Sequence, residues 1–105
     1  MKSVDIETRV DLTIEELRAC VSAMDKTILL AIEKRFMYTD IIGHKKWQNK
    51  IEIQNPEVEL SKLEMLDGLA VACGIDRKVI KTIFRTIIDE SSLRQTAINK
   101  YDNHV

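Results

Sequence analysis

Polar side chains stand at several positions where helical spacing predicts a hydrophobic one. Arg35 and Lys46 interrupt a long apolar series, and their separation of 11 residues is close to three full turns, so they share one face of a helix. Two long cationic side chains on one face could close on a small anion between them. The alternative is that their aliphatic stems pack while the charged ends stay in water.

Three further exceptions occur later in the chain. Ser91 and Gln95 are four residues apart, which makes them neighbours on a face otherwise spaced for burial. Buried polar groups need hydrogen-bond partners, which can be backbone, water or a ligand. Glu59 lies four residues before Leu63 in the inward series of a shorter segment. There it is either exposed at the helix start, where the helix dipole favours it, or directed into a site.

Together these groups favour binding of a small polyanion that carries hydroxyl or ether oxygens. They lack the Ser–His or Cys–His pairing of nucleophilic catalysis, and the sequence contains no phosphate-binding loop or metal-ligand cluster. We therefore expect no cofactor and no metal. Arg18 is a third candidate cation, but it lies about 25 Å before Arg35 along a helix. It can reach the same small ligand only from a second chain.

A long helix must carry the first cations. Thr13 and Glu16 form the pattern of a capping box, and no proline follows before Pro56, which predicts a helix from about residue 13 to about 48. Apolar residues recur in steps of three and four along it: Ile14, Leu17, Val21, Met24, Ile28, Ala31, Tyr38 and Ile42.

Two shorter helices must carry the remaining groups. Asn55 and Pro56 are a typical N-cap and first helical residue, and they predict a helix that runs to about residue 73 and stops at Gly74. Asp76 predicts the cap of a third helix, which continues to about Lys100. Residues 1–11 and 101–105 are expected to fray.

The predicted fold is therefore all-α, a single domain over residues 1–105 with a long, a short and a medium helix. A long helix of roughly 50 Å does not fit a compact monomer of this length. Its continuous apolar stripe needs a partner, and the two shorter helices cannot cover it. We expect a homodimer in which two long helices pack against each other, because paired C2 assemblies are the commonest solution.

Composition excludes several classes of partner. With a net charge of −1, the chain lacks the excess of positive charge that is typical of proteins that bind nucleic acid or an acidic membrane. The N-terminus has no apolar signal segment, and no apolar run is long enough for a membrane span. Cys20 and Cys73 form no CxxC pair, so we expect both to be reduced, buried side chains of a cytoplasmic protein.

Four stretches of the chain carry a family pattern: LRACVSAMDKTILLAIEKR, IGHKK, NPEVE and IIDESSLRQ. With these stretches the chain resembles the all-helical chorismate mutases, the AroQ class, from about Ile14 to about Lys100. The resemblance implies an intertwined dimer with two sites, each built from both chains. It implies that Arg18 of the partner chain and Arg35 hold the carboxylates of chorismate. Ser91 would assist with a carboxylate, while Lys46 and Gln95 would donate to the ether oxygen.

One part of the family pattern differs here. The resemblance implies that Glu59 accepts from the ring C4 hydroxyl, but Val58 stands where the family usually carries arginine, and Asn55 where aspartate is common. The uncharged Val58 leaves alternatives open: a mutase for 4-amino-4-deoxychorismate, an isochorismate pyruvate lyase, or a non-catalytic helical dimer. The predicted function is conversion of chorismate to prephenate in phenylalanine and tyrosine biosynthesis.

Overall fold

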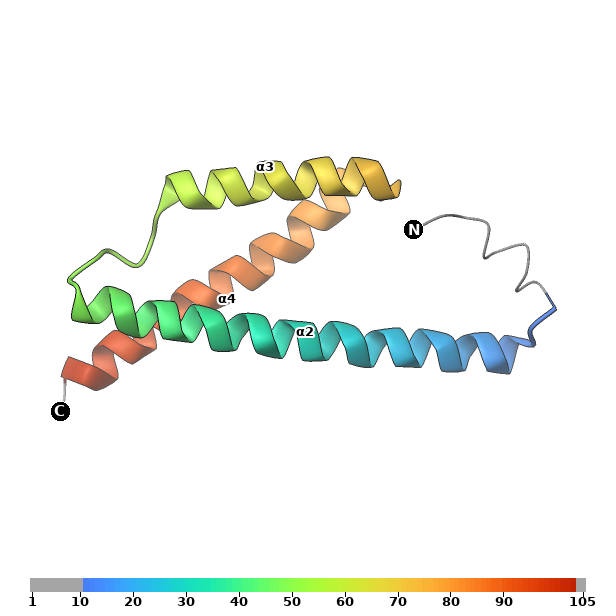
Figure 1. The fold of residues 1–105 in the computed structure, drawn as a ribbon, viewed down its shortest axis with the longest axis horizontal. Coiled ribbons are helices and arrows are strands. Elements are labelled where there is room, and N and C mark those ends of the chain that lie inside the picture. The colour runs from blue at the N-terminus through green and yellow to red at the C-terminus, as the bar shows by residue number, and fades with distance from the viewer. Residues whose placement is uncertain (1–10, 104–105) are drawn as a thin grey trace. The chain divides into compact units, whose positions relative to one another are not determined.

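A computed structural model describes residues 11–103, and their regular structure is three α-helices with no strand in that range. The helices are α2 (Ile14–Gln48), α3 (Pro56–Cys73) and α4 (Arg77–Asn103), as Figure 1 shows. The predicted all-α class and the order of a long, a short and a medium helix are confirmed. α4 continues through residue 103, a little beyond the predicted end at about Lys100. Residues 1–10 and 104–105 lie outside the described residues.

Side-chain caps fix where the helices begin. Glu16 Oε1 accepts from the Thr13 backbone N–H at 3.2 Å, and Thr13 Oγ1 accepts from the Glu16 N–H at 3.0 Å, which completes the predicted capping box. The Asn55 side chain caps α3, and Pro56 occupies its first turn. Asp76 accepts a backbone N–H from the first turn of α4 at 2.8 Å. Each cap satisfies a backbone donor that the helix cannot pair internally.

The end of α3 depends on the conformation of Gly74. Its φ of 71° is left-handed, which glycine adopts without the steric cost that a Cβ imposes. The N–H of Ile75 donates back to the carbonyl of Ala70 at 2.9 Å. This closing pattern satisfies the last carbonyls of α3 and lets the chain turn into α4, as predicted.

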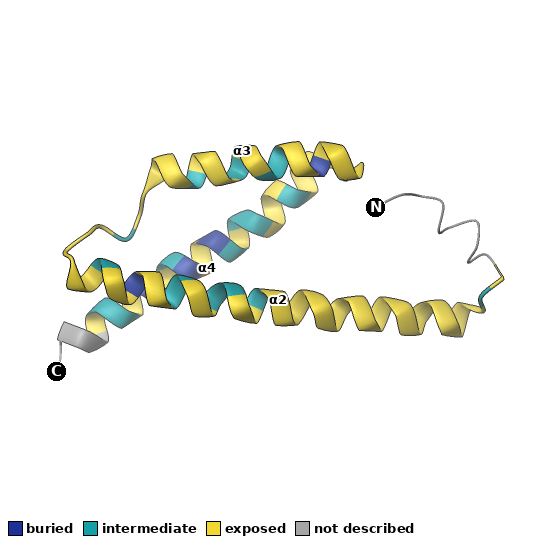
Figure 2. Ribbon diagram, viewed as in Figure 1, coloured by how far each residue is buried: buried dark blue, intermediate teal, exposed yellow. Residues whose placement is uncertain are grey.

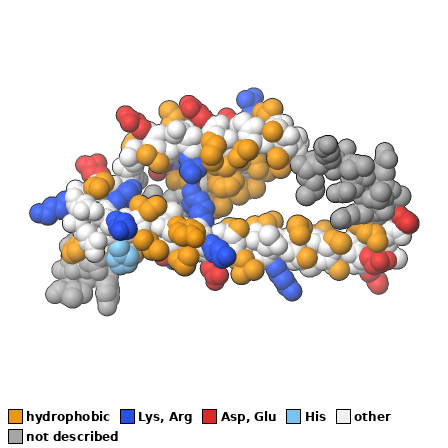
Figure 3. Space-filling model, viewed as in Figure 1, with side chains coloured by type: hydrophobic (Ala, Val, Ile, Leu, Met, Phe, Trp, Pro, Cys, Tyr) orange, Lys and Arg blue, Asp and Glu red, His pale blue; other side chains and the backbone are white. Residues whose placement is uncertain are grey.

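Contacts within the chain divide it into two compact units, Met1–Lys34 and Arg35–Val105. In the described part of the first unit, the apolar series of α2 is exposed. Its large hydrophobic side chains keep between 39% and 67% of their surface (Figures 2 and 3). Cys20 in this unit and Cys73 in the other are also exposed. The expectation of buried cysteines is therefore wrong for the single chain.

The second unit contains the buried residues of the described chain. α3 packs against α4, and the last turns of α2 cross α4. The buried hydrophobic residues are Ala70 and Ile88, and Ser91 and Gln95 are the buried polar residues (Figure 2). Gly43 is the buried residue of α2. Apart from Gly43, which has no side chain, two of the four buried residues in the described range are polar. That share is unusual for a core that serves packing alone.

An ion pair holds the end of α2 against α4. Arg94 donates to Asp40 through two bonds, Nε to Oδ1 at 3.0 Å and Nη2 to Oδ2 at 2.6 Å. This bidentate geometry is the strong form of such a pair. The hydrogen bond from Arg94 lowers the pKa of the Asp40 carboxyl from its ordinary value. The same guanidinium lies 4.9 Å from the centre of the Phe36 ring.

The close approach of α2 and α4 requires glycine at position 43. A Cβ there would lie 2.7 Å from Gln95 Cγ and 3.4 Å from Gln95 Cα. We expect Gly43→Ala to lower the free energy of unfolding by about 1–3 kcal/mol, because overpacking forces the helices apart. The measurement is urea denaturation followed by circular dichroism at matched protein concentrations.

Gly68→Ala is the matched control for this prediction. A Cβ at Gly68 meets nothing within 4 Å, and the residue lies inside α3. The control should gain about 0.5–1 kcal/mol from helix propensity. A Gly43→Ala protein as stable as the Gly68→Ala protein would show that the crossing is not tightly packed at Gly43.

Candidate active site

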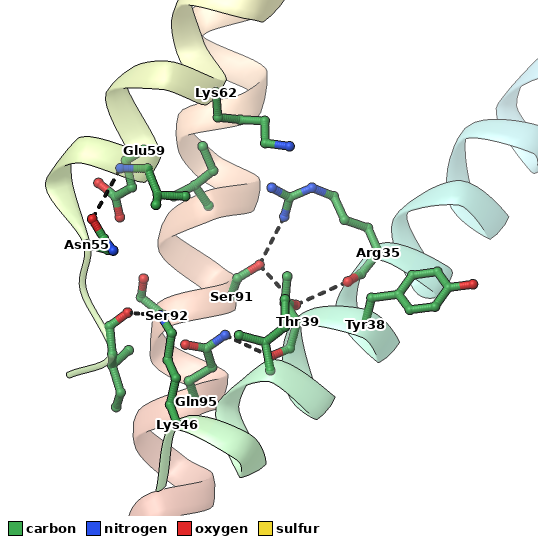
Figure 4. A pocket seen from close by; sticks show the side chains of 14 residues that line it. Arg35, Tyr38, Thr39, Lys46, Asn55, Glu59, Lys62, Ser91, Ser92 and Gln95 are labelled. Atoms are coloured by element: carbon green, nitrogen blue, oxygen red, sulfur yellow. Dashed lines mark hydrogen bonds between the residues drawn. The ribbon is translucent and has the colours of Figure 1, made fainter. Parts of the chain in front are cut away.

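A cavity of about 390 Å³ lies between the end of α2, α3 and α4 in the second unit. Residues of all three helices and of the connection between α2 and α3 line it (Figure 4): Arg35, Tyr38, Thr39, Ile42, Lys46, Ile53, Asn55, Val58, Glu59, Lys62, Ile88, Ser91, Ser92 and Gln95. The cavity volume lies in the range of small-molecule sites.

The structure brings together all but one of the residues predicted from the sequence. Seven of them line the cavity: Arg35, Lys46, Asn55, Val58, Glu59, Ser91 and Gln95. Arg18 belongs to the first unit, where it is exposed. Arg35 and Lys46, which their spacing places on one face of a helix, both line this cavity.

Arg35 is held by the hydroxyl of a buried serine. Its Nη1 donates to Ser91 Oγ at 3.1 Å, and the Ser91 hydroxyl donates to the Ile87 carbonyl at 3.0 Å. Because the serine proton is directed to that carbonyl, its lone pairs remain free to accept from the arginine. Partial burial lowers the pKa of the Arg35 guanidinium from its usual value, although the group stays protonated. A cation that has lost part of its hydration favours an anionic ligand.

The amide of Gln95 is fixed by a backbone carbonyl. Its Nε2 donates to the Thr39 carbonyl at 2.7 Å, and the residue is only 5% exposed. A primary amide has two N–H hydrogens, so one remains for another acceptor. The bond to Thr39 therefore orients a second donor without consuming it.

Lys46 is fixed in a similar way, also by a backbone carbonyl. Its Nζ donates to the carbonyl of Ile53 at 2.6 Å, which ties the end of α2 to the connection that leads into α3. An ammonium group has three N–H donors, and two remain after this bond. Lys46 and Gln95 thus both line the cavity as oriented donors with capacity to spare (Figure 4).

Glu59 is the acidic residue among those that line the cavity. The sequence left open whether its side chain would be exposed or directed into a site. The Glu59 side chain is 29% exposed to solvent, and its Oε2 lies 3.5 Å from Nη1 of Arg85 in α4. That distance is long for a hydrogen bond, so the carboxylate is still available to a ligand. The neighbouring Val58 lines the same cavity without charge.

Sequence reasoning missed three polar residues that line the cavity: Thr39, Lys62 and Ser92. Thr39 and Lys62 each had a signal in their spacing. Thr39 lies one turn after Arg35, and Lys62 lies one turn after Val58, so each shares a helix face with a predicted site residue. Ser92 directly follows Ser91, and nothing in its spacing distinguishes it.

The charges around the cavity are mostly positive. Arg35, Lys46 and Lys62 supply three cations, and Glu59 supplies a single carboxylate. The excess positive charge suits a small dianion. No helix within residues 11–103 is both long and apolar enough to cross a membrane.

Comparison with known protein families agrees with this geometry. Residues 17–96 match the family described as chorismate mutase type II, and the match covers more than half of the chain. The chain belongs to this family. It is accordingly an isomerase of the chorismate mutase kind, and chorismate is the substrate that the family implies. A comparison with curated proteins gave no match.

Proposed function

We propose that the cavity of this chorismate mutase converts chorismate to prephenate for phenylalanine and tyrosine biosynthesis. The observation that carries the proposal is the pair of oriented donors, Lys46 and Gln95, which line one cavity with Arg35. The reaction is a [3,3] rearrangement: the ether C–O bond breaks while a C–C bond forms between the enolpyruvyl side chain and the ring. It needs no proton transfer, covalent intermediate or co-reactant, so the site must position the dianion and stabilise developing charge.

Positioning falls to the cations. Arg35, held by Ser91 at 3.1 Å, would bind one carboxylate of chorismate, with the serine hydroxyl at the same end of the cavity. A second carboxylate would bind Arg18 of a partner chain. Holding both carboxylates brings the side chain over the ring in a near-attack geometry, which lowers the entropic part of the barrier.

Charge stabilisation falls to Lys46 and Gln95. Negative charge grows on the ether oxygen as the C–O bond lengthens, and fixed donors there act without reorganising. The bonds to the Ile53 and Thr39 carbonyls hold each donor in place before the substrate arrives. The low-dielectric surroundings of the buried Gln95 strengthen the interaction.

Glu59 would accept the hydrogen of the C4 hydroxyl at the other end of the ring. Asn55 lies one turn earlier, but its Oδ1 already caps α3 by accepting from the Val58 N–H at 3.2 Å. The uncharged Val58 side chain adds no donor to this end. The same arrangement supports a second candidate substrate, 4-amino-4-deoxychorismate, because Glu59 could pair with its ammonium group.

We further propose that residues 1–105 act as one domain within an intertwined homodimer. The support is the exposed apolar series of α2 in the first unit, where Val21, Met24 and Ile28 each keep between 57% and 59% of their surface. A monomer seldom leaves so continuous an apolar face in water. Two copies of α2 packed together would cover that face, and would bring Arg18 of each chain to the cavity of the other.

A turnover comparison tests the proposed reaction. We expect the purified protein to consume chorismate, followed by its ultraviolet absorbance, and to form prephenate. Turnover of the 4-amino analogue should be weaker, and isochorismate should not be cleaved. Lys46→Met should lower kcat/KM on the order of 10²-fold or more, because it removes a donor to the ether oxygen.

Lys45→Met is the matched control, since Lys45 is exposed in the same turn and does not line the cavity. It should retain wild-type turnover. Conversion of the amino analogue alone would refute the chorismate assignment, and turnover of none of the three compounds would favour a non-catalytic dimer.

Mixing two inactive variants tests the shared site. Arg18→Ala and Arg35→Ala chains should each be nearly inactive alone. In a heterodimer of the two, one site keeps both arginines and the other loses both. Random re-pairing at equal concentrations should therefore restore about a quarter of wild-type activity. No recovery, with heterodimers demonstrated by native mass spectrometry, would exclude donation of Arg18 across the interface.

A further inference from the structure

Lys62 is a cation of the cavity wall that the proposed mechanism does not use. It lies on α3 and lines the cavity together with Arg35 (Figure 4). Figure 4 shows its amino group directed toward the guanidinium of Arg35, whose own bond runs to Ser91. Two positively charged groups that face each other across a cavity form a natural position for an anion between them.

The amino group of Lys62 has no counter-charge of its own. No residue in the described range 11–103 forms an ion pair or hydrogen bond with it. The acidic residue of the cavity, Glu59, makes its ion-pair contact with Arg85, at 3.5 Å, and not with Lys62. The amino group of an ordinary surface lysine points into solvent, whereas that of Lys62 points into a cavity that is also lined by the Arg35 guanidinium. Like charges placed in this way repel until an anion binds between them.

The position of Lys62 on α3 bears on Val58. The two residues are one turn apart, so their side chains leave the same face of the helix. Val58 is uncharged and lines the cavity, so it adds no positive charge there. Lys62 lines the same cavity from the next turn, so the positive charge absent at position 58 is present one turn further along α3.

We propose that Lys62 binds the substrate carboxylate that Arg35 also holds, and so supplies the charge that Val58 lacks. This inference rests on the proposed function, because the anion it assigns is a carboxylate of chorismate. A flexible ammonium group contributes charge without the fixed fork of an arginine. Its contribution should therefore appear mainly in substrate affinity, and less in the rate of the bound complex.

Steady-state kinetics on chorismate test the assignment. Lys62→Met keeps the length of the side chain and removes its charge. We expect it to raise KM about tenfold, as loss of a charge-assisted bond does, while kcat changes less than threefold. Lys81→Met is the control, since Lys81 is an exposed lysine of α4 that does not line the cavity. It removes the same net charge and should leave KM unchanged.

Two further variants separate charge from packing. Lys62→Arg should keep a KM close to that of the wild type. Adding Val58→Arg to the Lys62→Met protein should recover most of the lost affinity. The same Val58→Arg change in the wild-type protein should lower KM by a smaller factor. Melting temperatures of all variants should agree, because Lys62 is exposed and unpaired among the described residues.

The outcomes distinguish the two proposals. An active wild type whose KM is changed equally by Lys62→Met and Lys81→Met overturns the role of Lys62 and leaves the proposed function standing. An active wild type in which Val58→Arg gives no recovery also overturns it. A wild type that does not turn over chorismate overturns the proposed function, and the assignment of Lys62 falls with it.

Discussion

The hydrogen bond from Gln95 to the Thr39 carbonyl is the constraint on which the rest of the site depends. A buried amide must be paired, and the bond of 2.7 Å pairs it across the crossing of α2 and α4. Gly43 makes that crossing possible, because any side chain there would meet Gln95. The distance between the two helices is thus set by a polar group, and the same group lines the cavity.

The remaining contacts of the second unit follow the same pattern. Ser91, one turn before Gln95, bonds to Arg35, and Asp40 and Arg94 form an ion pair between the same two helices. The apolar core beside them is small, with Ala70 and Ile88 as its buried hydrophobic residues. Such a core offers little hydrophobic stabilisation. In the proposed dimer the exposed face of α2 would supply the rest, so that folding, assembly and site formation would be linked.

Local chemistry explains why much of the fold could be predicted from the sequence. The helix caps bond to backbone groups within one turn of their own position, so their capping role can be predicted from neighbouring residues. The capping residues are Thr13, Glu16, Asn55 and Asp76. Ser91 and Gln95 could be predicted for a similar reason, because each is a polar residue on a helix face that is otherwise apolar. Lys62 interrupts no apolar series. Its one signal in the sequence is its position one turn after Val58, and that signal gains meaning only from the path of α3 beside the cavity. The bond from Lys46 to Ile53 likewise depends on the course of a connection that periodicity does not describe.

The pH profile of kcat/KM for Gln95→Glu, compared with Gln95→Leu, tests most directly whether the residue at position 95 donates to the ether oxygen. Only a protonated carboxyl has a hydrogen to donate, and the buried position should raise the pKa of the introduced group above the ordinary value of about 4.3. Activity of Gln95→Glu should therefore rise steeply as the pH falls from about 8 to about 5, while Gln95→Leu stays low throughout. A Gln95→Glu protein whose activity does not depend on pH, or never exceeds that of Gln95→Leu, would contradict the role assigned to Gln95.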